Sequence, residues 1–190
     1  MSKILFFDLE TTGVDKEKNA IHQLAGKVWI DGSFKESFNI KMKPFEGAII
    51  EPGALQVSGV TADMVNGYPP QSLAYKEFTN LLSKYVDKFD KRDKFFLAGF
   101  NNAWFDNEFL RRFFERNGDK YFGSWFWANS IDVFILAAPR LMYKRADMAD
   151  FKLKTVAKAL GLEVDESRLH DAQYDIELTA QMYFRIQSTL

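Results

Sequence analysis

The pattern of hydrophobic and polar residues predicts that the chain begins with three β-strands. The first covers residues 3–9, which are almost all apolar, as in a buried strand. The next two cover segments 24–30 and 34–43 and are joined by Asp31-Gly32, a dipeptide typical of a tight hairpin. In the last segment apolar and polar residues alternate, which predicts one buried face. The apolar residues of that face are Phe34, Phe38, Ile40 and Met42.

Helical periodicity follows a largely irregular stretch over residues 44–70, which contains Pro52-Gly53 and Pro69-Pro70. The predicted elements are, in order, a helix over 72–89, a short strand at 94–98, a helix over 107–116 that stops near Asn117-Gly118, a strand turning into a helix at 130–134, a helix over 153–160 ended by Gly161, and a helix over 172–186. The first of these helices should bury Ala74, Phe78, Leu81, Leu82, Tyr85 and Phe89. Three early strands followed by alternating helices and strands predict an α/β fold with a mixed central sheet.

Composition and charge are those of an ordinary globular protein. With 190 residues and no repeat or linker, residues 1–190 are expected to form one domain. The net charge of -1 excludes a uniformly basic nucleic-acid coat protein but leaves room for a local basic rim. The absence of cysteine excludes disulfides, thiol catalysis and cysteine-bound zinc. No apolar run is long enough for a signal segment or a membrane span, so we expect a cytoplasmic protein.

Two acids in the first strand raise the question of which cation accompanies them. Asp8 and Glu10 stand two residues apart, so their side chains point to the same face of the strand, with Cα atoms roughly 6.5–7 Å apart. Two anions that close repel each other unless a positive charge lies between them. An unpaired acid after the apolar run "ILFF" would also be buried at a cost of several kcal/mol. Further acids stand at or near predicted helix starts, Asp106 after "GFNNAWF" and Asp175 in "HDAQYD".

The position of His170 relative to Asp175 constrains how the last helix begins. If both residues were helical, their separation of five would place them about 140° apart around the helix axis, so that they would not share one site. We therefore expect His170 in the loop before the helix and Asp175 in its first turns. Asp171 is then expected to cap the helix or to complement its dipole from the first turn.

Together these residues resemble the three motifs of the DEDDh 3′–5′ exonucleases, a family that includes the proofreading epsilon subunit of bacterial DNA polymerase III, RNase T and oligoribonuclease. The segments that carry the resemblance, in the family's order, are "FDLETTG", "NNAWFD" and "HDAQYD". "ALQVSGVTADMV" is similar to the segment beside the substrate, although Ser58 stands where many members have His. "FKLKTVAKALGL" resembles the helix before the last motif. The resemblance implies a ribonuclease H-like fold with a mixed sheet flanked by helices.

The resemblance also implies a two-metal mechanism. Phosphodiester hydrolysis needs an activated water and stabilisation of charge on the attacked phosphate, and two divalent ions supply both. Hard oxygen ligands suit Mg²⁺ or Mn²⁺. By resemblance, Asp8 bridges both ions, Glu10 and Asp175 complete one site, and Asp106 supports the other. His170 then takes the proton from the attacking water.

Contacts to the substrate are expected around these acids. The residues implied by the resemblance are Thr11, Thr12 and Gly13 at the terminal 3′-hydroxyl, Val14 and Leu55 against the last base, and Asn102 and Phe105 near the scissile end. Trp104 is a weaker candidate, and Phe105 is equally consistent with core packing. Four basic residues allow two interpretations: a basic rim that guides phosphates, or an ordinary solvated face, which is the more common arrangement. They are Lys144, Arg145, Lys152 and Lys154. A single strand is favoured as substrate because a paired end must first fray.

Three functions are compatible with this pattern. The first is an active metal-dependent 3′–5′ exonuclease that releases nucleoside monophosphates from single-stranded DNA or RNA. The second is a non-catalytic nucleic-acid binding module on the same fold, which predicts loss of at least one of the five motif residues, and all five are present. The third is a proofreading subunit in a polymerase complex; because the chain ends at Leu190, soon after the last helix, a stand-alone enzyme is preferred. The sequence does not distinguish DNA from RNA.

Overall fold

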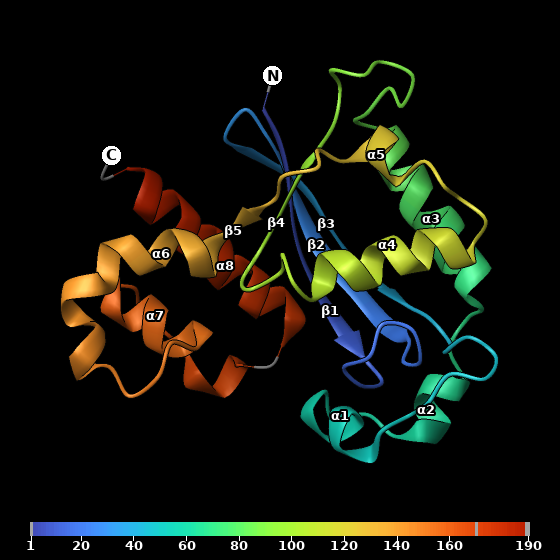
Figure 1. The fold of residues 1–190 in the computed structure, drawn as a ribbon, viewed down its shortest axis with the longest axis horizontal. Coiled ribbons are helices and arrows are strands. Elements are labelled where there is room, and N and C mark those ends of the chain that lie inside the picture. The colour runs from blue at the N-terminus through green and yellow to red at the C-terminus, as the bar shows by residue number, and fades with distance from the viewer. Residues whose placement is uncertain (1, 170, 189–190) are drawn as a thin grey trace.

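The fold is built on one mixed sheet. In the computed structural model, which describes residues 2–169 and 171–188, five strands lie in the order β3-β2-β1-β4-β5 (Figure 1). The strands are β1 (Lys3–Thr11), β2 (Ile21–Ile30), β3 (Ser33–Lys41), β4 (Phe96–Gly99) and β5 (Ile131–Asp132). β1 pairs antiparallel with β2 and parallel with β4, and β4 pairs parallel with β5. The predicted α/β class with a mixed sheet is confirmed.

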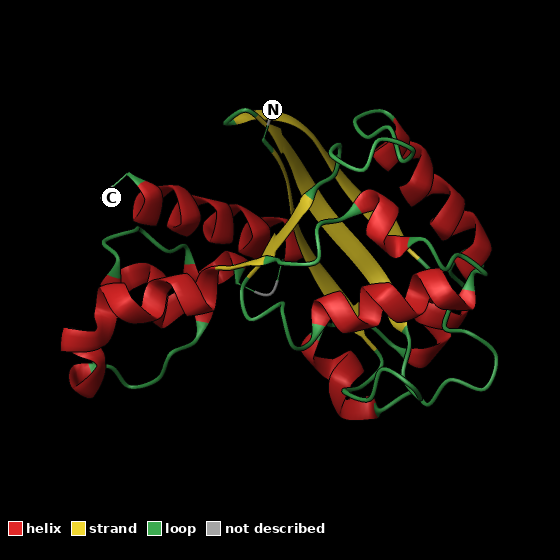
Figure 2. Cartoon of the chain, turned by 45° about the horizontal axis from the view of Figure 1, so that its top comes forward, coloured by secondary structure: helices red, strands yellow, loops and turns green. Residues whose placement is uncertain are grey.

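Helices cover both faces of the sheet (Figure 2). Their bounds are α1 (Pro52–Val57), α2 (Ala62–Asn66), α3 (Gln71–Ser83), α4 (Asp106–Arg116), α5 (Phe122–Trp125), α6 (Val133–Leu141), α7 (Leu153–Ala159) and α8 (Ala172–Gln187), with short 3₁₀ turns at Met142–Asp147 and Glu166–Arg168. In the described part of the chain no helix is both long and apolar enough to cross a membrane. The single domain and the cytoplasmic location remain predictions.

Alternation along β1 divides the core into two layers. Leu5, Phe7 and Leu9 belong to the apolar core that includes residues of α3, α4 and α5. Ile4 and Phe6 point the other way and pack with residues of α8. Because side chains two apart share a face, Asp8 and Glu10 follow Phe6 onto the α8 side of the sheet. The strand period alone therefore decides which helix faces the two acids.

The hairpin between β2 and β3 forms as predicted, but the face expected for Phe34 is wrong. Asp31 and Gly32 both adopt positive φ, at 49° and 76°, as a two-residue hairpin turn of this hand requires. A bulge then shifts the register between Val28 and Trp29, so that Phe34 pairs with Trp29. Phe34 contacts the Trp29 ring, with centroids 6.0 Å apart, and remains 50% exposed. The alternation continues only from Phe38 onward.

Two further expectations are corrected by the structure. The stretch 44–70 is not irregular throughout, because α1 and α2 form within it, with a proline in the first turn of α1 and Thr61 capping α2. The helix predicted over 72–89 ends at Ser83, and Phe89 is 86% exposed instead of buried. Local turns replace its last part, since the Asp87 side chain accepts a hydrogen bond from the Phe89 backbone N–H.

We predict that Gly26→Ala destabilises the protein by about 1–3 kcal/mol, because overpacking a filled core costs this much. A Cβ atom at Gly26 would lie 2.4 Å from the Phe38 ring and 2.9 Å from the Phe6 carbonyl oxygen. Gly123→Ala is the matched control, since a Cβ there has nothing within 4 Å. Urea unfolding of the three proteins measures the difference. Equal stability of the two variants would contradict the packing described for Phe38.

Candidate active site

Asp8 and Glu10 occupy the middle and the end of β1. Both are partly buried, and they lie on the face of the sheet that α8 covers. Immediately after Glu10 the pairing of β1 with β2 shifts register, which ends the regular strand. The two acids thus sit where the sheet gives way to the loop that begins with Thr12.

Asp106 reaches the same region from the first residue of α4. It is 7% exposed, and the loop before it contains Asn101 at a positive φ of 62°. The Asp132 carboxylate fixes this loop, because it accepts hydrogen bonds from the backbone N–H groups of Asn101 at 2.9 Å and Ala103 at 3.2 Å. Asp132 also caps α6 by accepting from the Phe134 N–H. The residue that orients the Asp106 loop therefore comes from β5, at the edge of the sheet.

Asp175 lies in the first turn of α8, as predicted. The Asp171 side chain caps this helix by accepting a hydrogen bond from the Tyr174 N–H at 2.9 Å. α8 is held against β1 and its neighbours by small and branched apolar residues, among them Ala172 and Ile176. Asp175 is partly buried, and its backbone carbonyl accepts from the Thr179 hydroxyl. His170, the predicted general base, lies outside the described residues.

Electrostatics tie the four acids Asp8, Glu10, Asp106 and Asp175 into one group, which we call the carboxylate cluster. Removal from water raises the pKa of Asp8 well above its usual value, and the negative charges of the other three acids raise it further. Removal from water and the Asp175 charge raise the pKa of Glu10 to about 7. The pKa of Asp106 is raised to about 7, again mainly by burial. A hydrogen bond from the Leu9 backbone opposes the rise for both Asp8 and Asp106.

The donor set of the carboxylate cluster fits divalent cations. Its members supply only carboxylate oxygens, and the raised pKa values of Asp8, Glu10 and Asp106 are those of a site in need of positive charge. Within residues 2–169 and 171–188, however, no three His, Asp or Glu side chains already converge with the spacing of a metal site. The acids are gathered by the fold, whereas their oxygen atoms are not fixed around one point.

Some of the predicted substrate contacts are exposed, whereas others are buried or hydrogen-bonded within the protein. Val14 is 78% exposed, whereas Leu55 and Asn102 are buried at 4% and 0% exposure. The Thr12 hydroxyl donates to the Ile49 carbonyl, and its backbone N–H donates to the Ala20 carbonyl, so Thr12 holds the loop together. The contact roles of these residues, and those of Thr11 and Gly13, stay predictions.

A groove of about 430 Å³ lies beside the start of α4, and we call it the proximal groove. It is lined by Val14, Asp15, Lys16, Trp104, Phe105, Glu108 and Phe109. Trp104, the weaker candidate from the sequence, is 82% exposed here, while Phe105 packs on Phe109 with ring centroids 4.9 Å apart.

Sequence reasoning missed the role of Asp132. The available signal was an acid that ends a short strand directly before a helix.

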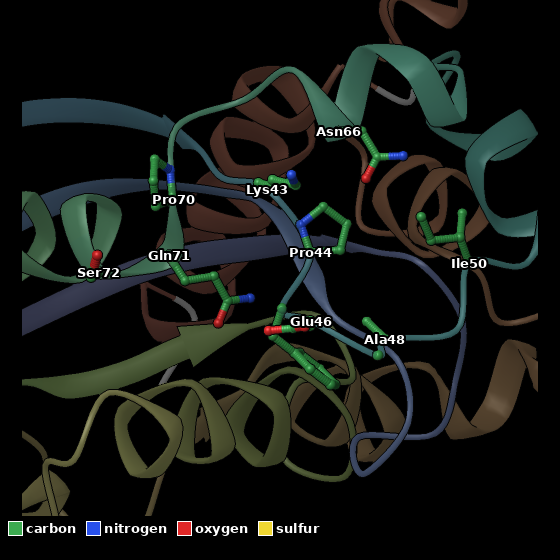
Figure 3. Close-up of a pocket in the computed structure, with 11 residues that line it drawn as sticks. Lys43, Pro44, Glu46, Ala48, Ile50, Asn66, Pro70, Gln71 and Ser72 are labelled. Carbon is green, nitrogen blue, oxygen red and sulfur yellow. The ribbon is translucent and has the colours of Figure 1, made fainter.

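Two other features lie apart from the carboxylate cluster. A hollow of about 720 Å³ is lined by the loop after β3 and by the end of α2 and start of α3 (Figure 3). Its described lining residues include none of the predicted site residues.

In the predicted basic rim, Lys154 forms an ion pair with Glu166 at 2.6 Å, and Arg145 lies over the Phe151 ring. The rim's role toward phosphates stays a prediction.

Comparison with known proteins finds relatives among nucleases and a DNA polymerase. Ribonuclease T of Shewanella frigidimarina is 28% identical over 182 residues, which are 93% of this chain and 78% of the relative. Exodeoxyribonuclease I of Escherichia coli is 29% identical, over 95% of this chain and 39% of its own length. A PolC-type DNA polymerase III of Listeria innocua is 26% identical, over 95% of this chain and 11% of the polymerase. The chain thus spans most of ribonuclease T but only a part of the other two.

Solved structures support the same fold. The zinc-bound form of E. coli exonuclease I with single-stranded DNA superposes with a TM-score of 0.78, over 100% of this chain and 41% of that one. At 22% sequence identity this likeness bears on the fold alone, and it confirms the ribonuclease H-like arrangement of a mixed sheet flanked by helices. The RNase T exonuclease family profile matches residues 5–183. Because that match covers nearly the whole chain, this protein belongs to the RNase T family of exonucleases.

Proposed function

We propose that this chain is a metal-dependent 3′–5′ exonuclease that releases nucleoside monophosphates from single-stranded DNA or RNA. The observation that carries the proposal is the carboxylate cluster, in which acids from β1, α4 and α8 lie close enough to raise the pKa of Asp8 together. Such a group is unfavourable without cations and suits Mg²⁺ or Mn²⁺ when ionised. Membership in the exonuclease family supplies the reaction class.

The residues of the cluster have distinct proposed roles. Asp8 lies among the other three acids, so it is the side chain suited to bind two ions at once. Glu10 and Asp175 influence each other directly and would share one ion, and Asp106, at the start of α4, would hold the second. When bound, the two ions would supply the Lewis acidity and the activated water of phosphodiester hydrolysis. His170 would accept the proton of that water.

The positioning of the substrate is assigned to the proximal groove. Its apolar wall, with Trp104 and Val14 at 82% and 78% exposure, can receive the terminal base, while the phosphate meets the cluster. A single strand suits this arrangement because its bases are free to stack. A polymerase partner is a second candidate context, favoured by the match to a segment of a PolC-type polymerase.

We expect the purified protein with Mg²⁺ or Mn²⁺ to shorten single-stranded oligonucleotides from the 3′ end. Asp8→Asn should lower the rate by more than about 100-fold, since changes to groups that merely support metal ligands already cost about 10–100-fold. Asp63→Asn, an exposed acid of α2, is the matched control and should retain full activity. Gel analysis of 3′- and 5′-labelled DNA and RNA strands measures direction and sugar preference together. Release from the 5′ end, or full activity of Asp8→Asn, would refute the proposal.

The variant His170→Ala tests whether His170 is a general base or a metal ligand. Its loss should cost about 10²–10⁴ in rate and remove the pH limb of the imidazole, because general base catalysis contributes this much. Mn²⁺ affinity should stay near the wild-type value, whereas Asp8→Asn should lose it. Calorimetric Mn²⁺ titration beside rate measurements over pH provides the test. If His170→Ala loses Mn²⁺ binding as severely as Asp8→Asn, His170 is a ligand and its role as base is wrong.

The raised pKa values predict that the metal-free protein loses stability as pH rises. Glu10 has a pKa of about 7 in the folded state, against about 4.3 when unfolded. Between these values the folded state binds more protons than the unfolded state, so the free energy of unfolding falls with rising pH and the loss is complete above pH 7. Glu10→Gln, which does not ionise, should therefore gain about 1–3 kcal/mol over the wild type at pH 8 and little at pH 4.

Thermal and urea unfolding in chelator at both pH values measure this difference. Saturating Mn²⁺ should reverse it at pH 8, because the ion binds the ionised carboxylates of the folded wild type. Glu163→Gln, which changes an exposed glutamate before α8, serves as the control; it keeps Glu10 and should lose stability with rising pH as the wild type does. A wild-type protein as stable as Glu10→Gln at pH 8 in chelator would contradict the repulsion inferred for the cluster.

A further inference from the structure

A second groove, of about 750 Å³, lies at the far end of α4 from the carboxylate cluster, and we call it the distal groove. Its walls come from α3, from the loop before β4, and from the segment between α4 and α5. The lining residues are Tyr75, Lys88, Phe89, Lys91, Asn117, Gly118, Asp119, Tyr121, Ser124 and Trp125. The elements that carry the carboxylate cluster, β1, α4 and α8, contribute no lining residue, although Asn117 follows directly after α4.

Four aromatic residues line the distal groove, and two of them face solvent. Phe89 is 86% exposed and Tyr121 is 74% exposed, although both are large apolar groups. Trp125 is 3% exposed and forms part of the fixed wall. Tyr75 is anchored by packing on Phe114, with ring centroids 5.3 Å apart. Two exposed rings beside two fixed ones offer π-faces on which further flat, apolar groups can stack.

The lining of the groove carries two lysines and one acid beside its aromatic rings. The Lys88 ammonium lies 5.4 Å from the Phe89 ring centroid and 5.6 Å from that of Trp125. Neither Lys88 nor Lys91 forms an ion pair with any residue that the structure describes. The acid in the lining, Asp119, is engaged, since it accepts hydrogen bonds from the Tyr75 hydroxyl and from the Tyr121 N–H. The two ammonium charges are thus available to an anionic ligand.

α4 connects the distal groove to the proximal groove. The helix has 11 residues, so its ends lie about 16 Å apart. The proximal groove flanks its N-terminal turn through Glu108, and the distal groove begins at Asn117, directly after its last turn. Figure 1 shows α4 running from the end of the sheet that holds the site toward α3 and α5. Arg111 is exposed midway along the helix, with its guanidinium 4.5 Å from the Phe122 ring centroid.

We propose that the distal groove binds the 5′ part of a single-stranded substrate whose 3′ end lies in the active site. Bases stack on Phe89 and Tyr121, and phosphates face Lys88 and Lys91, which is the combination that sequence-tolerant single-strand binding sites use. The inference rests on the proposed exonuclease function for the direction of the strand. A peptide would satisfy the rings, but a polyanion with flat bases satisfies both the rings and the unpaired ammonium groups.

The test is binding affinity as a function of strand length. Fluorescence anisotropy in chelator, with the full chain and labelled oligo-dT and oligo-U of 3 to about 15 nucleotides, should show a steep gain once a strand spans the roughly 16 Å of α4. Phe89→Ala/Tyr121→Ala should lose about 10-fold or more in affinity for long strands, as single stacking residues are worth at least this much. Affinity for the trinucleotide should be unchanged. Lys88→Ala should reduce the salt dependence for long strands by about one ion.

Phe34→Ala is the matched control, because it removes an exposed aromatic side chain of β3 that contacts Trp29 and lines neither groove. It should bind long strands like the wild type, and thermal unfolding should show all variants folded. Equal affinity of wild type and Phe89→Ala/Tyr121→Ala for long strands would overturn the inference, whatever else occupies the groove. Hydrolysis of the trinucleotide with Mn²⁺ reports separately on the proposed function. A length-dependent loss in the variant supports the groove even where no hydrolysis is seen.

Discussion

Repulsion among the partly buried carboxylates at the end of β1 is the constraint to which the rest of the structure responds. The charges of Glu10, Asp106 and Asp175 raise the pKa of Asp8, so the folded state holds the four acids together at a cost. Local devices offset part of that cost: Asp106 and Asp175 stand in the first turns of α4 and α8, where the helix dipole favours negative charge. The remaining imbalance is what a divalent cation would neutralise, so the site is electrostatically prepared for one.

Packing supplies the force that holds the acids in place. On one face of the sheet, aromatic rings fix α4; Phe114 contacts Tyr75, Phe78 and Phe122 edge to face. On the other face, small residues of α8 allow the helix to lie close to Phe6 and Ile4 of β1. Apolar burial at about 25 cal/mol per Å² can outweigh the repulsion of a few charges. The many buried phenylalanines thus help to hold α4 and β1, and with them the acids, in place.

The limits of sequence reasoning follow from the range of the interactions involved. The period of two in β1 placed Asp8 and Glu10 on one face, and the cap at Asp171 set the start of α8, because both depend on neighbours in the chain. The predicted burial of Phe34 was wrong because the pairing of β3 with β2 contains a bulge, and such a bulge depends on both strands. The role of Asp132 and the proximal groove were missed because they join segments some 30 to 90 residues apart. The meeting of Asp106 with Asp8 came from family resemblance, not from spacing.

A nearly neutral protein must still bind a polyanion, and the distribution of charge resolves this apparent conflict. The net charge is -1, and acids are concentrated where cations would bind, so the bare site repels phosphate. The attractive charges lie elsewhere: Lys88 and Lys91 line the distal groove, and Arg111 is exposed on α4. If binding and hydrolysis use separate sites in this way, aromatic stacking at the distal groove can hold the strand whatever its base sequence. In the proposed mechanism, the carboxylate cluster with its bound ions would act only on the terminal phosphodiester bond, because that bond alone would reach it.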